Sequence, residues 1–303
     1  MDLLALMAAF VRVVEAGSFT AVAEQTGQSQ PTISRQIAAL ERHLGARLIN
    51  RTTRALALTE EGAGFLERAR TALDAVAEAE ATVGRRRLQP TGQLRLATPV
   101  AFGRLHIVPR LSRLLGRYPE LSLDLVLHDG ASDLVEEGID LAIRIGTISD
   151  PGLVARQIGE TRRVTVAAPS YLARAGTPAV PADLSGHDCI VYTRLATGAV
   201  WRFEAATGAI DVTVTGRFRA NNSEAVREAA LAGLGIAVVP TWLLADEIAR
   251  GQLTVLLRDF EPKRLPMHAV HPSRRYVPPR TRAAIDFFAA EFRLDSTFSS
   301  AIV

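Results

Sequence analysis

Residues 17–45 read GSFTAVAEQTGQSQPTISRQIAALERHLG and decide the fold of the N-terminal part of the chain. The stretch predicts two helices joined by a polar turn. Ser18 is a favourable N-cap for the first, short helix, which a glycine ends. Ser29 or Gln30 can cap the second, because Pro31 is tolerated in the first turn of a helix.

The second helix has two unlike faces. Apolar side chains recur at helical spacing on one of them: Ile33, Ile37, Leu40 and Leu44. The opposite face carries Pro31, Thr32, Arg35, Ala38, Ala39 and Arg42. Arginines beside small residues make this face cationic and thin.

The neighbouring segments complete a small domain. Leu3, Leu6, Met7, Phe10 and Val14 predict a first amphipathic helix that ends at Gly17. Residues 47–59 predict a hairpin with residues 50–54 at its tip. A long helix then runs from its cap, Thr59, to about Arg87. Its apolar stripe predicts a coiled-coil-like dimerisation element: Leu66, Ala69, Leu73, Val76 and Val83.

Composition and charge restrict the class of protein. The 303 residues suggest about two domains, and 48% hydrophobic with 22% charged residues is typical of a soluble globular protein. The net charge is +3, yet the segment from Gly27 to Thr59 holds five arginines against Glu41 alone. This concentration predicts a module that binds a polyanion.

Features of secreted and membrane proteins are lacking in the sequence. The single cysteine, Cys189, excludes an intramolecular disulfide framework and fits a reducing cytosol. The stretch from Gly233 to Ala245 is apolar and uncharged but contains Pro240 and is too short to span a bilayer. No basic cluster precedes the first apolar residues, so we expect no secretory signal and a cytoplasmic location.

From Gln93 the pattern changes to alternating strands and helices, which predicts a mostly parallel α/β sheet. A helix is expected at 100–118. Two similar lobes with a cleft between them fit this length. The expected strands are 94–97, 121–127, 141–145, 164–168, 190–192, 212–219 and 235–239.

The chain resembles the LysR-type transcriptional regulators. The resemblance rests on residues 17–21, 29–37, Leu40-Glu41 with Leu44-Gly45, and Leu58-Thr59 with Gly62. It continues in residues 97–99, 140–146 and 232–240.

The resemblance implies a winged helix-turn-helix, a long linker helix and a two-lobed α/β effector domain of periplasmic-binding-protein type. The implied domains are 1–58, 59–90 (linker, dimerisation helix and hinge) and 91–303. Lobe 1 would comprise about 91–162 and 266–292, and lobe 2 about 163–265.

In a helix-turn-helix the second helix enters the major groove. Glutamine can pair with adenine, arginine with guanine, and a threonine methyl can meet that of thymine. Hydroxyls at the head of the preceding helix suit phosphates, and arginines at the wing tip suit the minor groove. The candidate DNA-binding residues are Ser18, Thr20, Gln28, Ser29, Gln30, Pro31, Thr32, Ser34, Arg35, Arg51, Thr52, Thr53 and Arg54. A solvated polar helix is the alternative, and for Arg42 an ion pair with Glu41 competes with a phosphate contact.

In open α/β sheets, ligands bind in loops beyond the carboxyl ends of strands. Residues 98–101 end a strand and open a helix, so their backbone N–H groups form an anion seat. The candidate effector-binding residues are Thr98, Pro99, Val100, Ala101, His128, Arg144, Thr193, Asn221 and Asn222; Arg194 and Ser223 adjoin them. Two alternatives stay open: Asn222 or Ser223 as a helix cap, and Arg144 in an ion pair with Asp129 or Asp140.

Catalytic and cofactor motifs are missing. Gly233-Leu234-Gly235 lacks the third glycine of a dinucleotide loop, and no Gly-x-Ser-x-Gly occurs. His268 and His271 have a spacing that places them on opposite faces of a strand, so no metal pair is expected. Catalysis at His187-Asp188-Cys189 is not expected either, because adjacent residues rarely converge. We therefore expect no enzymatic activity, no cofactor and no metal site.

The sequence thus predicts a DNA-binding transcriptional regulator whose interlobe cleft binds a small-molecule effector. The expected partners are double-stranded operator DNA, a small organic acid or oxygenated aromatic, further copies in a homodimer or homotetramer, and RNA polymerase as a candidate; no membrane is expected. The rival hypothesis is a two-lobed solute-binding or enzymatic protein with an N-terminal assembly module.

Overall fold

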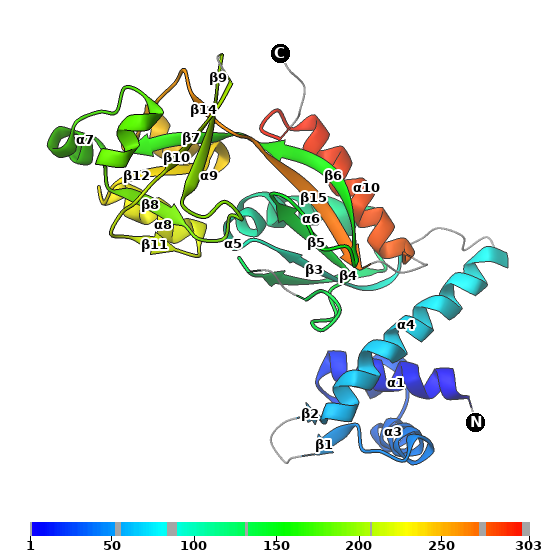
Figure 1. Cartoon of the computed structure of the whole chain (residues 1–303). Helices are drawn as coiled ribbons and strands as arrows, with labels where there is room; N and C mark the ends of the chain where they lie inside the picture. The colour runs from blue at the N-terminus through cyan, green and yellow to red at the C-terminus, as the bar shows by residue number, and fades with distance from the viewer. Residues whose placement is uncertain are drawn as a thin grey trace. The chain divides into compact units, whose positions relative to one another are not determined.

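A computed structural model describes residues 2–51, 56–83, 90–130, 133–206, 208–272 and 277–298. The chain divides into two compact units, Met1–Leu88 and Gln89–Val303, and each is described by itself (Figure 1). Residues of the predicted sites that fall in the gaps, Thr52, Thr53 and Arg54, lie outside the described residues.

The first unit is a helical domain with a two-stranded hairpin. Its elements are α1 (Leu3–Ala16), α2 (Phe19–Thr26), α3 (Gln30–Leu44), β1 (Ile49–Arg51), β2 (Leu56–Leu58) and α4 (Glu60–Val83). Glycines at positions 17, 27 and 45 end the three first helices in the left-handed conformation, as expected for helix C-caps. The hairpin expected at 47–59 is confirmed, since Ile49 pairs with Leu58 in antiparallel register.

The apolar stripes of these helices meet in one core. Phe10, Val22, Ile33, Ile37 and Leu40 are almost completely buried there. Burial of each such side chain stabilises the fold by about 1.5–3 kcal/mol. The predicted apolar face of α3 therefore holds this helix with its opposite face outward.

Helix α4 belongs partly to the same core. Thr59 caps it as predicted, with the Gly62 N–H donating to Thr59 Oγ1 at 2.9 Å. Ala69 is fully buried, and Leu66 and Leu73 pack against the core of the unit. The expectation that this whole stripe needs a partner chain is thus wrong for its first half, because α1 and its neighbours cover it within the chain.

Lobe 1 of the second unit is built on a five-stranded sheet of order β4-β3-β5-β15-β6. Strand β3 runs parallel to β4 and β5, whereas β15 runs antiparallel to β5 and β6. Helix α10 packs against this sheet through Phe288 and Phe292. The elements of lobe 1 are β3 (Gly92–Thr98), α5 (Val100–Phe102), the π-helical turn η1 (Gly103–Ile107), α6 (Val108–Arg117), β4 (Leu121–Leu127), β5 (Leu141–Ile145), β6 (Leu153–Thr161), β15 (Leu265–Pro272) and α10 (Pro279–Leu294).

Lobe 2 repeats this arrangement with the order β11-β8-β12-β7-β13, and a small sheet β10-β9-β14 lies beside it. Strands β11, β8 and β12 are parallel, while β7 and β13 are antiparallel neighbours. Its elements are β7 (Arg163–Ala167), α7 (Pro169–Ala175), the 3-10 helix η2 (Pro181–Gly186), β8 (Cys189–Tyr192), β9 (Val200–Ala205), β10 (Gly208–Thr213), β11 (Arg219–Ala220), α8 (Ser223–Leu231), β12 (Ile236–Pro240), α9 (Thr241–Ala249), β13 (Thr254–Leu256) and β14 (Glu261–Pro262).

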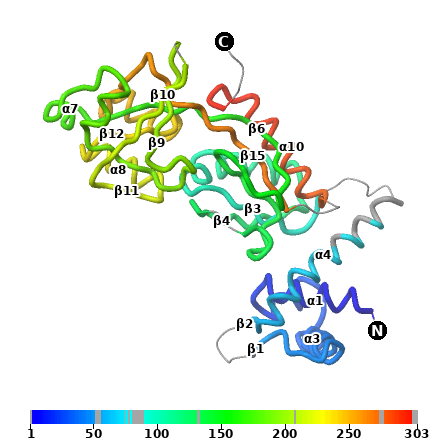
Figure 2. The backbone as a smooth tube through the Cα atoms, viewed as in Figure 1, coloured from blue at the N-terminus to red at the C-terminus, as the bar shows by residue number. Residues whose placement is uncertain are grey.

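The chain passes between the lobes twice. Strand β6 leads into β7 through Arg162, and β14 returns into β15 through Lys263 and Arg264. Strands β6 and β15 lie side by side along this route, as Figure 2 shows. Strand β15 is antiparallel to both of its neighbours, so it alone runs against the other four described strands of the lobe 1 sheet. Strand β7 alone does so among the described strands of the large sheet of lobe 2. Both sheets are thus mostly parallel, as expected.

Two expected elements are interrupted. The helix expected at 100–118 contains the π-helical turn η1, which ends two residues before Pro109. Proline lacks the N–H that would bond the carbonyl four residues before it, so the helix widens there. The strand expected at 212–219 is divided: β10 ends at Thr213 and β11 begins at Arg219. Between them, Gly216 lies so close to the Cys189 backbone that a Cβ would meet its oxygen at 2.0 Å.

Candidate functional site

The polar face of α3 is open to solvent at its N-terminal end. Gln28, Ser29, Gln30, Pro31 and Arg35 are exposed, and Thr32 and Ser34 are half-buried. The structure therefore presents together all the residues of the turn and first helical turns that the sequence marked for DNA. None of them is used to fill the core of the unit.

Three of these side chains are linked on the surface. Ser29 Oγ and Thr32 Oγ1 are hydrogen-bonded at 2.8 Å, and Arg35 Nη2 donates to Thr32 Oγ1 at 3.4 Å. Arg35 Nε donates to the Pro31 carbonyl at 3.3 Å. These bonds lay the guanidinium along the start of the helix and leave further N–H donors for an outside acceptor.

The head of α2 combines a cap with an exposed hydroxyl. Ser18 Oγ accepts a hydrogen bond from the Ala21 N–H at 3.3 Å, so its oxygen caps the helix while its own O–H stays available as a donor. Thr20 is exposed one residue into the helix. Both positions fit phosphate contacts at a helix N-terminus.

Glu41 attaches the hairpin to α3. Its Oε1 accepts from the N–H groups of Leu48 at 2.9 Å and Ile49 at 3.2 Å. The carboxylate is thus committed to the start of β1, and Arg42 instead donates to the Ala38 carbonyl at 3.2 Å. Of the predicted tip residues, Arg51 ends β1, and nothing is described of its side chain.

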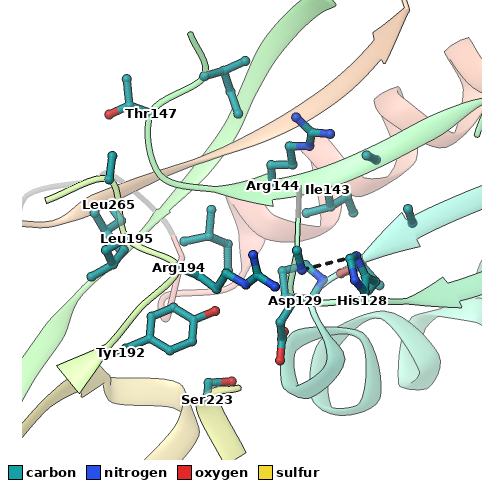
Figure 3. A pocket seen from close by; sticks show the side chains of 18 of the residues that line it. His128, Asp129, Ile143, Arg144, Thr147, Tyr192, Arg194, Leu195, Ser223 and Leu265 are labelled. Atoms are coloured by element: carbon teal, nitrogen blue, oxygen red, sulfur yellow. Dashed lines mark hydrogen bonds between the residues drawn. The ribbon is translucent and has the colours of Figure 1, made fainter. Parts of the chain in front are cut away.

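A cleft of about 950 Å³ lies between the two lobes of the second unit. Segments of both lobes line it (Figure 3). Five of the candidate effector-binding residues are among its walls: Thr98, Pro99, His128, Arg144 and Thr193. Four are not: Val100, Ala101, Asn221 and Asn222. This volume is at the upper end of the range for ligand pockets.

The predicted anion seat is filled by a side chain of the protein itself. Asp129 Oδ1 accepts the Val100 N–H at 3.0 Å, and Asp129 Oδ2 accepts from Asn222 Nδ2 at 2.5 Å. Asn222 also caps α8, with its Oδ1 accepting from the Ala225 N–H at 3.0 Å. The cap interpretation of Asn222 is confirmed, and Asp129 joins the two lobes.

Thr98 and Thr193 differ in the state of their hydroxyls. Thr98 is 3% exposed, and its Oγ1 has no hydrogen-bond partner among the described residues. Thr193 Oγ1 donates to the Ala220 carbonyl at 3.2 Å. A buried hydroxyl without a hydrogen-bond partner costs free energy, so a polar group of a ligand that bonds to Thr98 would recover that cost.

Charged side chains of both signs face the cleft. Arg163 is 9% exposed and donates from Nε to the Lys263 carbonyl at 2.8 Å, and its burial lowers its pKa to about 10. Arg144 stands on β5, in register with His268 of β15. The ion pair expected as an alternative for Arg144 is not formed with Asp140, which binds Arg280 instead.

Sequence reasoning missed several wall residues. Tyr192, Arg163, Trp242, Asp133 and Asp150 line the cleft but were not selected. Tyr192 could have been found, since it ends a strand directly before Thr193. The others depend on how the two lobes close on each other, for which the sequence carries no local signal.

Comparisons with known proteins agree with this architecture. The family described as "Bacterial regulatory helix-turn-helix protein, lysR family" matches residues 4–63, and "LysR substrate binding domain" matches residues 87–293. The chain belongs to the LysR family of transcriptional regulators.

Relatives of this LysR-type regulator cover nearly its whole length. It is 39% identical over 280 residues to the transcriptional regulator PtxR of Pseudomonas aeruginosa, covering 92% of this chain and 89% of the relative. It is 36% identical to CrgA of Neisseria meningitidis serogroup C over 283 residues, covering 93% and 94%.

Solved structures show the same architecture. The structure of CrgA from Neisseria meningitidis matches with a TM-score of 0.59 at 35% identity, covering 94% of this chain and 97% of that one. The full-length Vibrio cholerae virulence activator AphB matches with a TM-score of 0.57 at 29% identity, covering 95% and 98%. The N-terminal helix-turn-helix and the two-lobed second unit are therefore those of a LysR-type transcriptional regulator.

The family assignment favours the regulator over the rival solute-binding or enzymatic hypothesis. It also confirms the predicted fold class. Among the helices of the described ranges, none combines the length and the apolar character needed to cross a bilayer.

Proposed function

We propose that this LysR-type regulator binds duplex DNA with the exposed end of α3. Gln30, Thr32, Ser34 and Arg35 would face base edges in the major groove, and Gln28, Ser29 and Pro31 would line its entry. Ser18 and Thr20 would contact phosphates, and the wing residues Arg51, Thr52, Thr53 and Arg54 would contact the minor groove or its phosphates.

One observation carries this assignment. The polar residues in the first turns of α3 are exposed or half-buried, while its apolar residues Ile33, Ile37 and Leu40 are buried to within 1% of complete burial. A helix held this firmly by one face presents the other without further rearrangement. The positive charge of the segment then attracts the phosphates of the DNA backbone, whatever the base sequence.

Titration of the full chain against a duplex of unrelated sequence tests this proposal. At two salt concentrations, we expect affinity to fall steeply as salt rises. Replacing Arg35 and Arg42 together by alanine should weaken binding and reduce its salt dependence. An unchanged salt dependence in the double variant would contradict the proposed interface.

The remaining parts follow from the two lobes and the linker helix. We propose a winged helix-turn-helix in residues 1–58, a linker and dimerisation segment in 59–90 and an effector domain in 91–303. A small molecule in the cleft would change the closure of the lobes by binding one form more tightly than the other. Copies would associate as a dimer or tetramer, act in the cytoplasm alongside RNA polymerase, and catalyse no reaction.

Thr98 gives the test for the effector site. Replacing Thr98 by valine keeps the shape of the side chain and removes the unpaired buried hydroxyl. The variant should be at least as stable as the parent and should bind DNA equally, yet respond less to an effector identified by screening. Loss of stability, or an unaltered response, would remove Thr98 from the site.

A further inference from the structure

The cleft residue Arg194 has unused hydrogen-bonding capacity. It follows β8 in lobe 2, is exposed to the cleft, and makes no ion pair or hydrogen bond with any described residue. Figure 3 shows its side chain extending toward Asp129, with the Tyr192 hydroxyl beside it. An arginine fork offers five N–H donors in a plane that matches a carboxylate.

The acidic residues of the cleft are already engaged. Asp129 accepts from Val100 and Asn222, Asp150 from the Gly152 N–H at 2.8 Å, and Asp133 from two backbone N–H groups of its own loop. None of these three carboxylates forms an ion pair with an arginine within the described part of the chain. The positive charge of Arg194 therefore stays uncompensated by direct contact.

Charges of both signs act on the neighbouring Tyr192. Burial is the main cause that raises the pKa of its hydroxyl; Asp129 raises it further and Arg194 lowers it. Tyr192 is thus close to both, and its neutral O–H is a second donor beside the guanidinium. These two groups of lobe 2 form one polar corner of the cleft.

Apolar side chains of both lobes also line the cleft. Leu195 and Val226 of lobe 2 and Leu134 and Ile148 of lobe 1 line the cleft, with the Trp242 ring. A ligand that fills this space needs an apolar body. An anionic group on that body would find its counter-charge at Arg194.

We propose that Arg194 anchors a carboxylate of the effector, and that this carboxylate binds in lobe 2 across the cleft from the Thr98–Ala101 segment. That segment holds the Asp129 carboxylate, so a second anion is disfavoured there. The effector class is then a small organic acid with an apolar or aromatic body. The inference rests on the proposed effector function and deepens it.

Matched acids and amides test this assignment without knowledge of the natural ligand. The probes are benzoate with benzamide, 4-hydroxybenzoate with 4-hydroxybenzamide, and succinate with succinamide, titrated calorimetrically into the full chain. We expect at least one acid to bind about tenfold or more tightly than its amide, because a charged hydrogen-bonded pair is lost in the amide. A panel in which no acid exceeds its amide overturns the proposal.

Substitutions of arginine then test whether Arg194 is the residue that binds the carboxylate of the probe. Arg194→Gln should reduce the acid-to-amide ratio to about one, and Arg194→Lys should keep part of it. Arg217→Gln is the matched control, since Arg217 is an arginine of lobe 2 with a side chain 90% exposed and lies outside the cleft wall. A ratio that Arg194→Gln leaves intact overturns the proposal.

DNA affinity is measured on the same samples. Arg194→Gln should bind duplex DNA as the parent does, because Arg194 lies in the second unit and the proposed DNA interface lies in the first. If the parent fails to bind DNA, the proposed function fails; if only the acid preference is missing, the inference about Arg194 fails alone.

Discussion

Asp129 and Asn222 are ninety-three positions apart, yet their side chains meet at 2.5 Å between the two lobes of the second unit. The same Asp129 carboxylate accepts the Val100 N–H of lobe 1, and Asn222 caps α8 of lobe 2. A second link lies close by, where Arg104 of η1 pairs with Glu224 of α8 at 2.6 Å. The N-terminus of α8 is therefore tied to lobe 1 without any ligand.

Substitution of Asn222 should loosen this link. Asn222→Asp keeps a favourable cap for α8 but sets a second carboxylate against Asp129, so we expect the lobes to separate. Spin labels at Ser122→Cys in lobe 1 and Ser185→Cys in lobe 2, in a Cys189→Ala background, report the distance by double electron–electron resonance. The expected result is a longer and broader distance distribution.

Asn222→Ser supplies the comparison. Serine caps a helix about as well as asparagine but is too short to reach Asp129. We expect an intermediate widening, because the hydrogen bond is lost without repulsion and Arg104–Glu224 remains. If the parent, Asn222→Asp and Asn222→Ser gave the same distance distribution, the Asp129–Asn222 hydrogen bond would not contribute to the closure of the lobes.

Loss of Arg35 and loss of Gln30 should have different effects on DNA binding, because only Arg35 is charged. Arg35→Ala removes a base contact together with a positive charge, so affinity for the operator should fall by about 1–3 kcal/mol, affinity for other sequences should also fall, and the salt dependence should become weaker. Gln30→Ala should instead change the preference among operators by about 1–3 kcal/mol per base contacted. Fluorescence anisotropy at several salt concentrations separates the two.

The control for Arg35 is Arg68→Ala. Arg68 is an exposed arginine of α4 in the same unit, so its loss changes the net charge equally. We expect a smaller effect on affinity and slope. Equal effects for both arginines would mean that binding follows net charge and not the α3 surface.

Local signals in the sequence predicted most of the first unit. Ser18, Thr59 and Pro31 mark helix starts, and the spacing of Ile33, Ile37 and Leu40 fixes the buried face of α3, because these effects act within a few residues. The polar surface opposite follows from the same geometry. That is why the candidate DNA-binding face could be found without a structure.

Long-range features could not be predicted in this way. The Asp129–Asn222 bond, the burial of Ala69 by α1 and its neighbours, and the antiparallel strands β7 and β15 depend on how distant segments fold together. Sequence periodicity shows that a residue is buried but not which element covers it. The same limit explains why Arg163 and Trp242 were missed as cleft residues.

Because part of the apolar stripe of α4 packs inside the first unit, a substitution in that part tests the stability of the unit and not only dimerisation. Leu73 packs against the core of the first unit, so Leu73→Asp should lower the stability of that unit by about 1–3 kcal/mol and weaken DNA binding, whatever the oligomeric state. Differential scanning calorimetry of the full chain measures this loss of stability. Val76→Asp, outside that core, is the better probe of dimerisation by sedimentation velocity. A Leu73→Asp protein with unchanged unfolding would contradict this packing.

The stability of the second unit should fall in mild acid through His106. Its ring lies in an aromatic cluster, with centroids 5.0 Å from Trp242, 4.8 Å from Phe298 and 5.3 Å from Phe102. Burial, and next the charge of Arg110, lower its pKa to about 4 from the usual 6.5. His106 Nε2 has no hydrogen-bond partner among the described residues, and the charge of Asp295 offsets the lowered pKa only in part.

The direction of the effect follows from proton linkage. Between pH 6.5 and 4 the unfolded chain binds a proton at His106 that the folded chain does not, so the stabilising contribution present above pH 6.5 is lost as the pH falls. The loss is at most about 3 kcal/mol, and less where water reaches the ring. His268, whose pKa burial also lowers, adds a contribution of the same sign.

Urea unfolding followed by Trp fluorescence at several pH values measures this loss. His106→Phe keeps an aromatic ring in the cluster and cannot be protonated, so its stability should change less between pH 6.5 and 4 than that of the parent. His43→Gln, at an exposed position of α3, should retain the parent's dependence. If His106→Phe and the parent lost stability equally over this range, protonation of His106 would not be its cause.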